Sequence, residues 1–245
     1  MDNNNYAAIL MYHHIGDPPP GVKLWALYVS RLNFTFQMWY LKTSGFNVIP
    51  LSELRGMVAS GKKLPPYTVA LTFDDGFCDF YNNAAPILEK YKLPATVFMV
   101  SDQIGKTADW EDIHLTGTDR LMNNDELAEL LKNPLIEIAP HTKNHKKLPK
   151  LNYEQAYEEI NGSLKTISGI TGQKCESFAA PYGEYNSETL DILRKCEIKC
   201  AVTTDNRAFD TTKDNLLEIP RIIIRRNNHP PGFMYKMSRV FKRGK

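Results

Sequence analysis

Two adjacent carboxylates stand at the end of an apolar run. Residues 67–73 are expected to form a buried strand, and Asp74, Asp75 and Gly76 follow it directly. Neighbouring side chains at a strand end point to opposite sides of the backbone, so one carboxylate could bind a cation while the other holds a proton. The same pattern is typical of an ordinary solvated turn in which glycine supplies a positive φ.

Two histidines four residues apart form a second candidate pair. His141 and His145 follow the apolar segment 135–140, which is expected to be another buried strand. On a helical turn, residues at i and i+4 project from one face, so the two imidazoles could converge on one ion. One carboxylate and two histidines would leave a position for water, as in catalytic rather than structural zinc sites. Taken alone, the spacing also fits two exposed histidines.

Both motifs require strands that end at one edge of a sheet. Apolar runs that predict strands alternate with helical patterns along the chain, at 7–12, 46–49, 67–73, 95–100, 135–140, 177–180, 200–203 and 218–224. One helix is expected to end at Gly45, and others to begin near Ala84, Asn123, Asn152 and Ser187. This βα alternation predicts an α/β protein with a mostly parallel sheet, in which strand ends carry the site. Doubly wound and barrel closures both fit the pattern.

The segment 102–120 lacks periodicity and is long enough to be a loop over the site. Its length exceeds that of a simple connection between elements. We therefore expect it to cover part of a pocket.

Three motifs together resemble the polysaccharide deacetylase family, which includes the nodulation-type chitooligosaccharide deacetylases. They are Thr-Phe-Asp-Asp-Gly at 72–76, the two histidines with Leu148 after them, and Pro-Tyr-Gly at 181–183, in the family's order. Residues 11–14 and 36–54 further resemble the branch that deacetylates poly-N-acetylglucosamine. The resemblance covers residues 67–224 and implies a distorted (β/α) barrel of seven or eight mostly parallel strands, with residues 1–245 as a single domain.

The resemblance also implies a metal-dependent hydrolase that removes acetyl groups from N-acetylhexosamine units of a glycan. Asp75, His141 and His145 would hold the ion, and Asp74 would be the general base. The backbone N–H of Tyr182 would stabilise the oxyanion, although its ring could simply pack against the barrel. These ligands suit Zn²⁺, and Co²⁺, Ni²⁺ or Mn²⁺ could replace it.

The general acid departs from the common family pattern. Most relatives carry a histidine after a late Leu-x-Leu strand, whereas residues 222–226 include none. In the poly-N-acetylglucosamine branch the histidine after the tyrosine takes this role, which indicates His13. His14 and His229 are the alternatives, and a buried structural histidine is the other reading of His13.

A second departure concerns the residue that orients the base. Ala179 stands where many relatives have an arginine. Arg221, at the start of a late strand, is the substitute we expect. An arginine at this position could equally pair with a surface carboxylate.

Composition agrees with one globular domain and excludes some classes of partner. The 245 residues are 42% hydrophobic, enough for a large core, and 30 basic against 28 acidic residues leave a net charge of +2 that does not favour nucleic acid. Four cysteines without a disulfide or zinc pattern favour a reducing compartment. No run approaches the roughly 18 apolar residues of a membrane span. Residues 1–5 do not resemble an export signal, so the sequence predicts a cytoplasmic protein, or an exported one if a leader was removed.

Two alternative functions share this evidence. An O-acetyl esterase acting on acetylated xylan or similar sugars would use the same chemistry. A non-catalytic sugar-binding module is disfavoured, because such a module has no need of the base Asp74. The sugar, its linkage and the oligomeric state are not indicated by the sequence.

Overall fold

Two parallel strands form the centre of the sheet and end at the candidate site. The computed structural model describes residues 3–110 and 119–242. β1 (Tyr6–Tyr12) pairs in parallel with β5 (Thr68–Phe73), and Tyr12 lies opposite Phe73 at the shared edge. Every residue of β5 is buried, and β1 is buried from its second residue onward. The residues that follow the two strands therefore emerge side by side.

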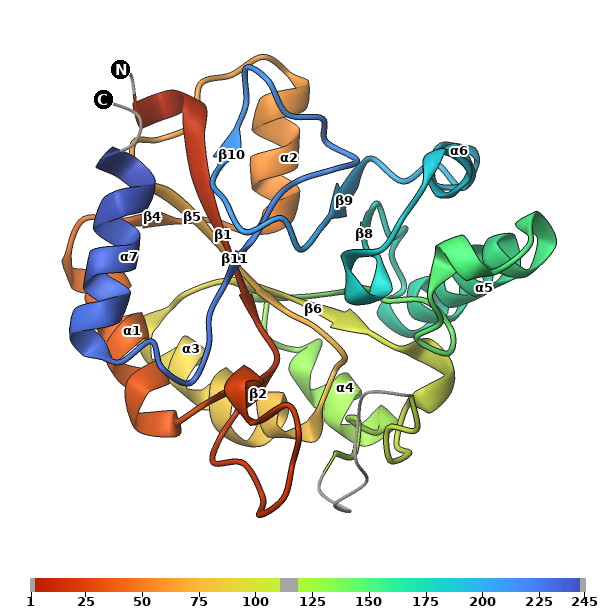
Figure 1. Ribbon diagram of the computed structural model, residues 1–245, viewed down its shortest axis with the longest axis horizontal. Helices are drawn as coiled ribbons and strands as arrows, with labels where there is room; N and C mark the ends of the chain where they lie inside the picture. The colour runs from red at the N-terminus through yellow and green to blue at the C-terminus, as the bar shows by residue number, and fades with distance from the viewer. Residues whose placement is uncertain (1–2, 111–118, 243–245) are drawn as a thin grey trace.

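The remaining strands close a distorted barrel around this pair (Figure 1). The bounds are β6 Ala95–Met99, β7 Ile136–Pro140, β8 Ser177–Ala179, β9 Cys200–Val202 and β11 Ile222–Ile223. β6 joins β5 to β7, β8 pairs with β9, and β11 returns to β1. A bridge between Val202 and Ile219 links β9 to the segment before β11. In the described chain, β7 and β8 share no backbone ladder.

The expected barrel is confirmed, with β1, β5, β6, β7, β8, β9 and β11 forming a ring of mostly parallel strands. β4 (Asn47–Val48) pairs with the start of β5, whereas β2 (His14–Ile15) and β3 (Tyr28–Val29) form a separate two-stranded sheet. β10 (Phe209–Asp210) is antiparallel to the start of β1. The fold is therefore α/β with one antiparallel addition.

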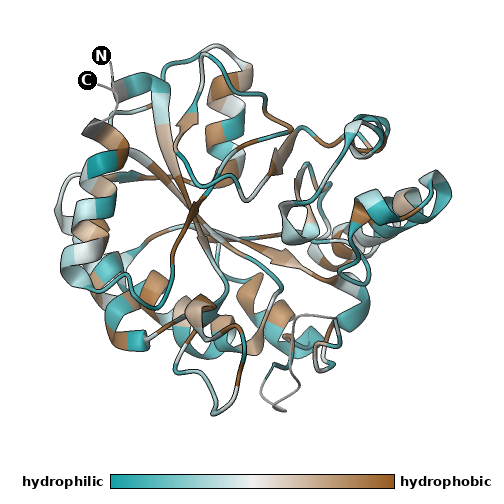
Figure 2. Cartoon of the chain, in the orientation of Figure 1, coloured by the Kyte–Doolittle hydropathy of each residue, from teal (hydrophilic) through white to brown (hydrophobic). Residues whose placement is uncertain are grey.

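Helices surround the barrel on the outside (Figure 1). They are α1 Arg31–Thr43, α2 Leu51–Ala59, α3 Ala85–Tyr91, α4 Asn124–Leu130, α5 Tyr153–Thr171, α6 Ser187–Lys195 and α7 Pro230–Lys242. Short 3₁₀ turns are η1 Asn3–Asn5, η2 Trp25–Leu27, η4 Ser101–Gln103, η5 Leu148–Lys150 and η6 Pro181–Gly183, and a π-helical η3 Phe80–Ala84 precedes α3. Figure 2 shows hydrophobic residues concentrated on the central strands and polar residues mostly on the outer helices.

Helix starts follow the capping signals in the sequence. Asn123 and Asn152 each form the expected capping box. The asparagine side chain accepts a hydrogen bond from the backbone N–H three residues later, and the Glu or Gln side chain at that later position accepts one from the backbone N–H of the asparagine. α6 begins at Ser187 as predicted, and Asn186 is its cap. Local chemistry therefore determines these boundaries.

The core has two layers, which alternate along β1. Leu10 and Tyr12 belong to the layer beneath the outer helices, whereas Ala7 and Ile9 belong to the smaller cluster inside the barrel. Alternate side chains of a strand face opposite sides, so both faces of each strand are covered. The interior layer also includes Ala179 from β8.

One predicted strand is shorter than expected, and one predicted loop lies partly outside the described residues. The predicted strand over 218–224 is reduced to β11, because Pro220 has no N–H to donate to a ladder. Of the predicted loop 102–120, residues 111–118 lie outside the described residues. Its two ends meet where Thr107 bridges Arg120.

Within the described residues, no helix combines the length and the apolar character needed to cross a membrane. All four cysteines are free thiols.

Candidate metal centre and active site

The chain turns sharply where β5 ends, and this turn presents the two carboxylates. Asp74 still follows the sheet, because its N–H donates to the carbonyl of Tyr12 at 3.0 Å. Asp75 and Gly76 both adopt positive φ, at 73° and 79°. A side chain at Gly76 would meet Met99 Sδ at 2.1 Å, so glycine is required there. A non-glycine residue held at positive φ is costly and is often found at functional sites.

Asp74 forms two hydrogen bonds with a buried arginine. Arg221 Nη1 and Nη2 donate to Asp74 Oδ1 and Oδ2, each at 2.6 Å, and the arginine is fully buried. Its Nε donates to the carbonyl of Thr203 at 2.9 Å. Burial alone would raise the pKa of the Asp74 carboxyl, but Arg221 outweighs it and holds that pKa below its usual value. Asp74 is therefore ionised at neutral pH.

Arg221 thus occupies the place that the sequence led us to expect. Both it and Ala179 belong to the interior of the barrel, where Arg221 also lies over the Phe98 ring at 5.8 Å. The bidentate geometry is the strong form of an arginine–carboxylate pair. The surface salt bridge considered as an alternative is wrong for this residue.

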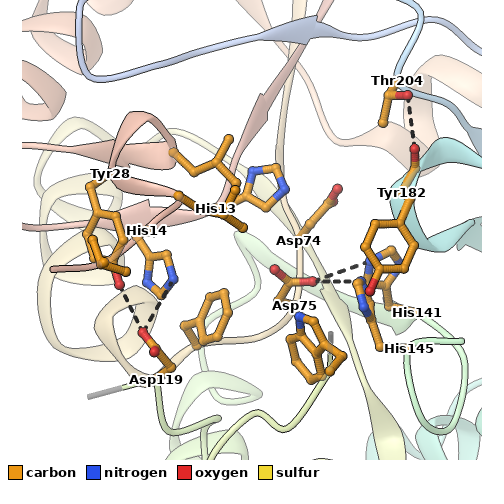
Figure 3. A pocket seen from close by; sticks show the side chains of 15 residues that line it. His13, His14, Tyr28, Asp74, Asp75, Asp119, His141, His145, Tyr182 and Thr204 are labelled. Carbon is orange, nitrogen blue, oxygen red and sulfur yellow. Dashed lines mark hydrogen bonds and ion pairs between the residues drawn. The ribbon is translucent and has the colours of Figure 1, made fainter. Parts of the chain in front are cut away.

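Asp75, His141 and His145 converge at the base of the cavity (Figure 3). Their potential ligand atoms all lie within 4.8 Å of one another, and all three side chains are buried. The Nε2 atoms of His141 and His145 lie 3.5 and 3.2 Å from Asp75 Oδ1. The structure therefore brings together the three residues that the sequence singled out.

The chemistry of these three side chains fits a divalent cation. His141 Nδ1 lies 2.8 Å from the carbonyl oxygen of Ala179, and because a carbonyl only accepts, Nδ1 carries a proton and Nε2 is the ring atom that faces Asp75. Burial lowers the pKa of His145 and favours the neutral form that binds metals. A carboxylate and two imidazole nitrogens in a buried site are stabilised by a shared ion.

The histidines do not lie on a helical turn, so that part of the prediction is wrong. Residues 141–145 form an irregular loop after β7, in which Thr142 and His145 adopt positive φ of 64° and 56°. The carbonyls of Thr142 and Lys143 accept from the N–H groups of Ser101 and Asp102 instead of from a helix. The imidazoles converge because the loop folds back on itself.

A buried glutamate from α5 holds this loop, and sequence reasoning missed it. Glu159 Oε2 accepts from the backbone N–H of Lys143 at 3.0 Å and of Asn144 at 2.8 Å. Its Oε1 accepts from Asn144 Nδ2 at 2.9 Å. Glu159 is only 7% exposed. The one signal in the sequence was a glutamate placed on the apolar face of the amphipathic helix α5, and this signal did not indicate which residues Glu159 would contact.

Tyr182 lies beside His145 and lines the same cavity. It occupies the middle of η6 with φ 60° and ψ 1°, and its carbonyl accepts from Thr204 Oγ1 at 3.3 Å. The ring packs on His145 with a centroid distance of 4.7 Å. With this left-handed backbone, Tyr182 lies in the wall of the cavity, and its ring also packs against a neighbouring side chain.

His13 and His14 diverge, and only His13 faces the carboxylates. Figure 3 shows the His13 ring beside Asp74 and Asp75. Burial lowers the pKa of His13, while the two carboxylates oppose that shift. Its Nδ1 is buried and has no hydrogen-bond partner among the described residues. The reading of His13 as a satisfied structural histidine does not fit this arrangement.

His14 is part of the cavity wall instead. Its ring is sandwiched between Tyr28 and Phe77, at centroid distances of 4.0 and 3.8 Å, and Nδ1 lies 2.7 Å from Asp79 Oδ2. Tyr28 in turn donates to the buried Asp119 at 2.9 Å. This network holds its members in fixed positions and was not foreseen from the sequence.

His229 lies far from the carboxylates. It is exposed at the start of α7, and its Nδ1 lies 3.2 Å from Asn33 Nδ2 on α1. Neither residue lines the cavity. Among the three histidines considered for proton donation, geometry favours His13.

The cavity that these residues enclose has a volume of about 220 Å³. Val22, Leu24 and Leu27 form an apolar part of its wall, and Trp110 stacks near His145 at a centroid distance of 4.4 Å. The segments that directly follow strands carry His13, Asp74, Asp75, His141, His145 and Tyr182, whereas Arg221 directly precedes β11. The fold and the site together define an α/β barrel with a candidate catalytic metal centre at the carboxyl ends of its strands.

Comparison with known proteins gives the family. The chain belongs to the polysaccharide deacetylase family, whose model matches residues 61–201. It is 32% identical over 197 residues to the Bacillus subtilis protein YxkH, and 31% identical over 204 residues to a poly-beta-1,6-N-acetyl-D-glucosamine N-deacetylase of Staphylococcus aureus. Each match covers 80% of this chain. The family predicted from the three motifs is confirmed.

A solved structure supports the same fold. The deacetylase PplD of Streptococcus pyogenes, in complex with acetate, superposes with a TM-score of 0.82 at 27% identity, over 95% of this chain and 98% of that one. The matches to YxkH and to the Staphylococcus aureus enzyme span 64% and 67% of those proteins. The chain thus corresponds to about two thirds of their length.

Proposed function

We propose that this protein is a metal-dependent hydrolase that removes acetyl groups from N-acetylhexosamine units of a polysaccharide or glycan precursor. The observation that carries the proposal is the Asp75, His141 and His145 cluster beside an ionised Asp74. The Staphylococcus aureus relative is named for N-deacetylation of poly-N-acetylglucosamine, which supports an amide rather than an ester. PplD, a deacetylase by name, was solved with acetate, the expected second product.

The cation is expected to be Zn²⁺, held by Asp75, His141 and His145, with Co²⁺, Ni²⁺ or Mn²⁺ as substitutes. When bound, such an ion polarises the acetyl carbonyl and lowers the pKa of a water molecule. Asp74 would take the proton from the attacking water as general base. Arg221 keeps Asp74 ionised and aims it through two hydrogen bonds.

Attack of the water oxygen on the acetyl carbon gives a tetrahedral oxyanion. We assign the stabilisation of this oxygen to the backbone N–H of Tyr182, and the support is that Tyr182 lines the site cavity with its ring against His145. The C–N bond then breaks, and His13 gives its proton to the departing nitrogen. The products are a free amine and acetate.

The test is release of acetate from a short N-acetylglucosamine oligosaccharide, compared with acetylxylan and with chelator-treated protein. We expect release from the oligosaccharide, loss after chelation, and recovery with added Zn²⁺. The variant Asp74→Asn provides an inactive control that should still bind metal.

O-acetyl esterase activity is the second candidate, because the same groups would hydrolyse an ester. Release of acetate from acetylxylan alone would establish that reading and overturn ours. Binding of the oligosaccharide without release from either substrate would indicate a sugar-binding module.

A further inference from the structure

A second cavity adjoins the candidate active site and is lined by lysines. It has a volume of about 650 Å³ and shares Trp110, His145 and Tyr182 with the site cavity. The two cavities are therefore adjacent, and we call the pair the cleft. Three lysines line the second one, which we call the lysine groove: Lys146, Lys147 and Lys150.

The loop that carries the metal-binding histidines also presents these lysines. Lys146 and Lys147 follow His145 directly, and Lys150 ends η5. The buried side chain of Leu148 anchors the segment, at 1% exposure. The backbone that carries the three lysines is therefore fixed beside the candidate site.

The charges of the lysine groove are only partly neutralised. Lys147 Nζ lies 4.6 Å above the Tyr182 ring and 3.4 Å from Glu184 Oε1. Lys146 and Lys150 are exposed, and in the described part of the chain neither has an ion-pair partner. The acidic residues lining the groove are Asp109, which is exposed, and Glu159. The oxygens of Glu159 already accept hydrogen bonds from residues of the histidine loop.

The other wall of the cleft is different in character. Val22, Leu24 and Leu27 line the site cavity and do not line the lysine groove. A glycan that occupies both cavities thus meets apolar groups in one and cations in the other. This difference between the two cavities favours one orientation of a bound glycan over the other.

We propose that the lysine groove binds an anionic group, a phosphate or a carboxylate, carried by the glycan next to the N-acetylhexosamine that is deacetylated. This inference rests on the proposed function. A neutral sugar gains no charge interaction from the lysines, and a chain with many free amines is repelled by them. The groove therefore favours an acidic glycan over a neutral or already deacetylated one.

The test compares three probes that differ only in one substituent. They are a short N-acetylglucosamine oligosaccharide, the same oligosaccharide with a phosphate monoester, and the same oligosaccharide with a carboxymethyl ether. Calorimetry measures binding and acetate release measures kcat/KM, each at low and high salt. We expect one or both anionic probes to bind about tenfold more tightly than the neutral probe at low salt, since exposed ion pairs are individually weak, and the preference to shrink at high salt. The two anionic arms show whether phosphate or carboxylate is favoured.

Two variants with the same change in net charge separate the groove from general electrostatics. Lys146→Glu/Lys150→Glu removes two groove cations, whereas Lys62→Glu/Lys199→Glu reverses two exposed lysines near the starts of β5 and β9, at the other edge of the barrel. The preference for anionic probes should vanish in the first variant and persist in the second.

Three results overturn the proposal: equal binding of all probes, no measurable binding of either anionic probe, or an equal loss of preference in both variants. The proposed function fails separately. Preferred binding of an anionic probe without acetate release would reject the deacetylase reaction and keep the groove. Equal acetate release from all probes, with equal binding, would keep the deacetylase reaction and reject the role of the lysine groove.

Discussion

The end of β5 and the loop after β7 both contribute residues to the candidate metal centre, but they are held in place differently. Asp74 and Asp75 follow a strand that is paired with β1 on one side and β6 on the other. The loop at 141–145 has no ladder of its own, and its backbone is held by Glu159 from α5 and by the segment at 101–102.

The difference shows what each kind of support requires. A residue at the end of a paired strand takes its position from the sheet, so one turn with a glycine suffices. A loop with two positive φ values needs partners from elsewhere in the chain to hold it. We therefore expect substitutions at the β5 end to act directly, on the candidate base or on one candidate ligand, and substitutions behind the histidine loop to act indirectly, by lowering metal affinity.

The largest effect is expected where the two regions share the ion. His141→Ala or His145→Ala should lose the bound metal and reduce acetate release to background, because two remaining ligands hold the ion poorly. Elemental analysis, activity and circular dichroism check this, with His229→Ala as an exposed histidine control. A variant of either residue with stoichiometric metal and full turnover would contradict the ligand assignment.

The next effect separates the two carboxylates of the β5 end. Asp74→Asn should keep the metal and lower turnover by about 10² to 10⁴, the usual contribution of a general base, whereas Asp75→Asn should weaken metal binding. Calorimetric titration with Zn²⁺, combined with turnover, distinguishes the two. The reverse pattern would mean that base and ligand have been exchanged.

His13 should show its role through pH and leaving group. His13→Ala should reduce amide turnover toward the lower end of the same range, with metal content unchanged. A general acid must be protonated, so the rate falls as pH rises through its pKa. Because burial lowers the pKa of His13, this alkaline limb begins at lower pH than for an ordinary histidine.

The pH–rate profile of His13→Ala should therefore lack the alkaline limb, and an activated ester should be hydrolysed relatively well, since its leaving group needs no proton. His14→Gln provides the matched comparison and should mainly lower the melting temperature, because its ring is packed between two aromatic rings. If His13→Ala retains normal amide turnover, the proton comes from elsewhere.

The smallest effect tests the support of the histidine loop. Glu159→Gln should weaken Zn²⁺ binding by about 10- to 100-fold, the range for groups that orient metal ligands. Glu158→Gln is the matched control, because the neighbouring Glu158 is exposed on α5 and pairs with the side chain of Lys143. Chelator competition measures both affinities. Equal affinities in the two variants would show that the loop holds its shape without Glu159.

Much of the site could be predicted because its signals are local. Residue type and position after an apolar run were enough to single out Asp74, Asp75, His141 and His145. Helix starts at Asn123 and Asn152 were also readable, since a capping box lies within four residues. In each case the informative residues are close in sequence.

The conformation of the histidine loop was not predictable in this way. A spacing of four fits a helical turn, but hydrogen bonds from distant segments decide the backbone instead. Glu159 acts on residues 15 and 16 positions away, and no local pattern announces such a contact.

The sequence by itself determined the family, the ligand types and the strand order of the motifs, because these depend on residue identity and short-range periodicity. Only the tertiary structure decided that Arg221 pairs with Asp74 across 147 positions and that His13, not His14, faces the carboxylates. Adjacent side chains point to opposite sides of a strand end, and which side becomes the cavity depends on how the barrel closes. That closure is a property of long-range packing, which no short stretch of sequence contains.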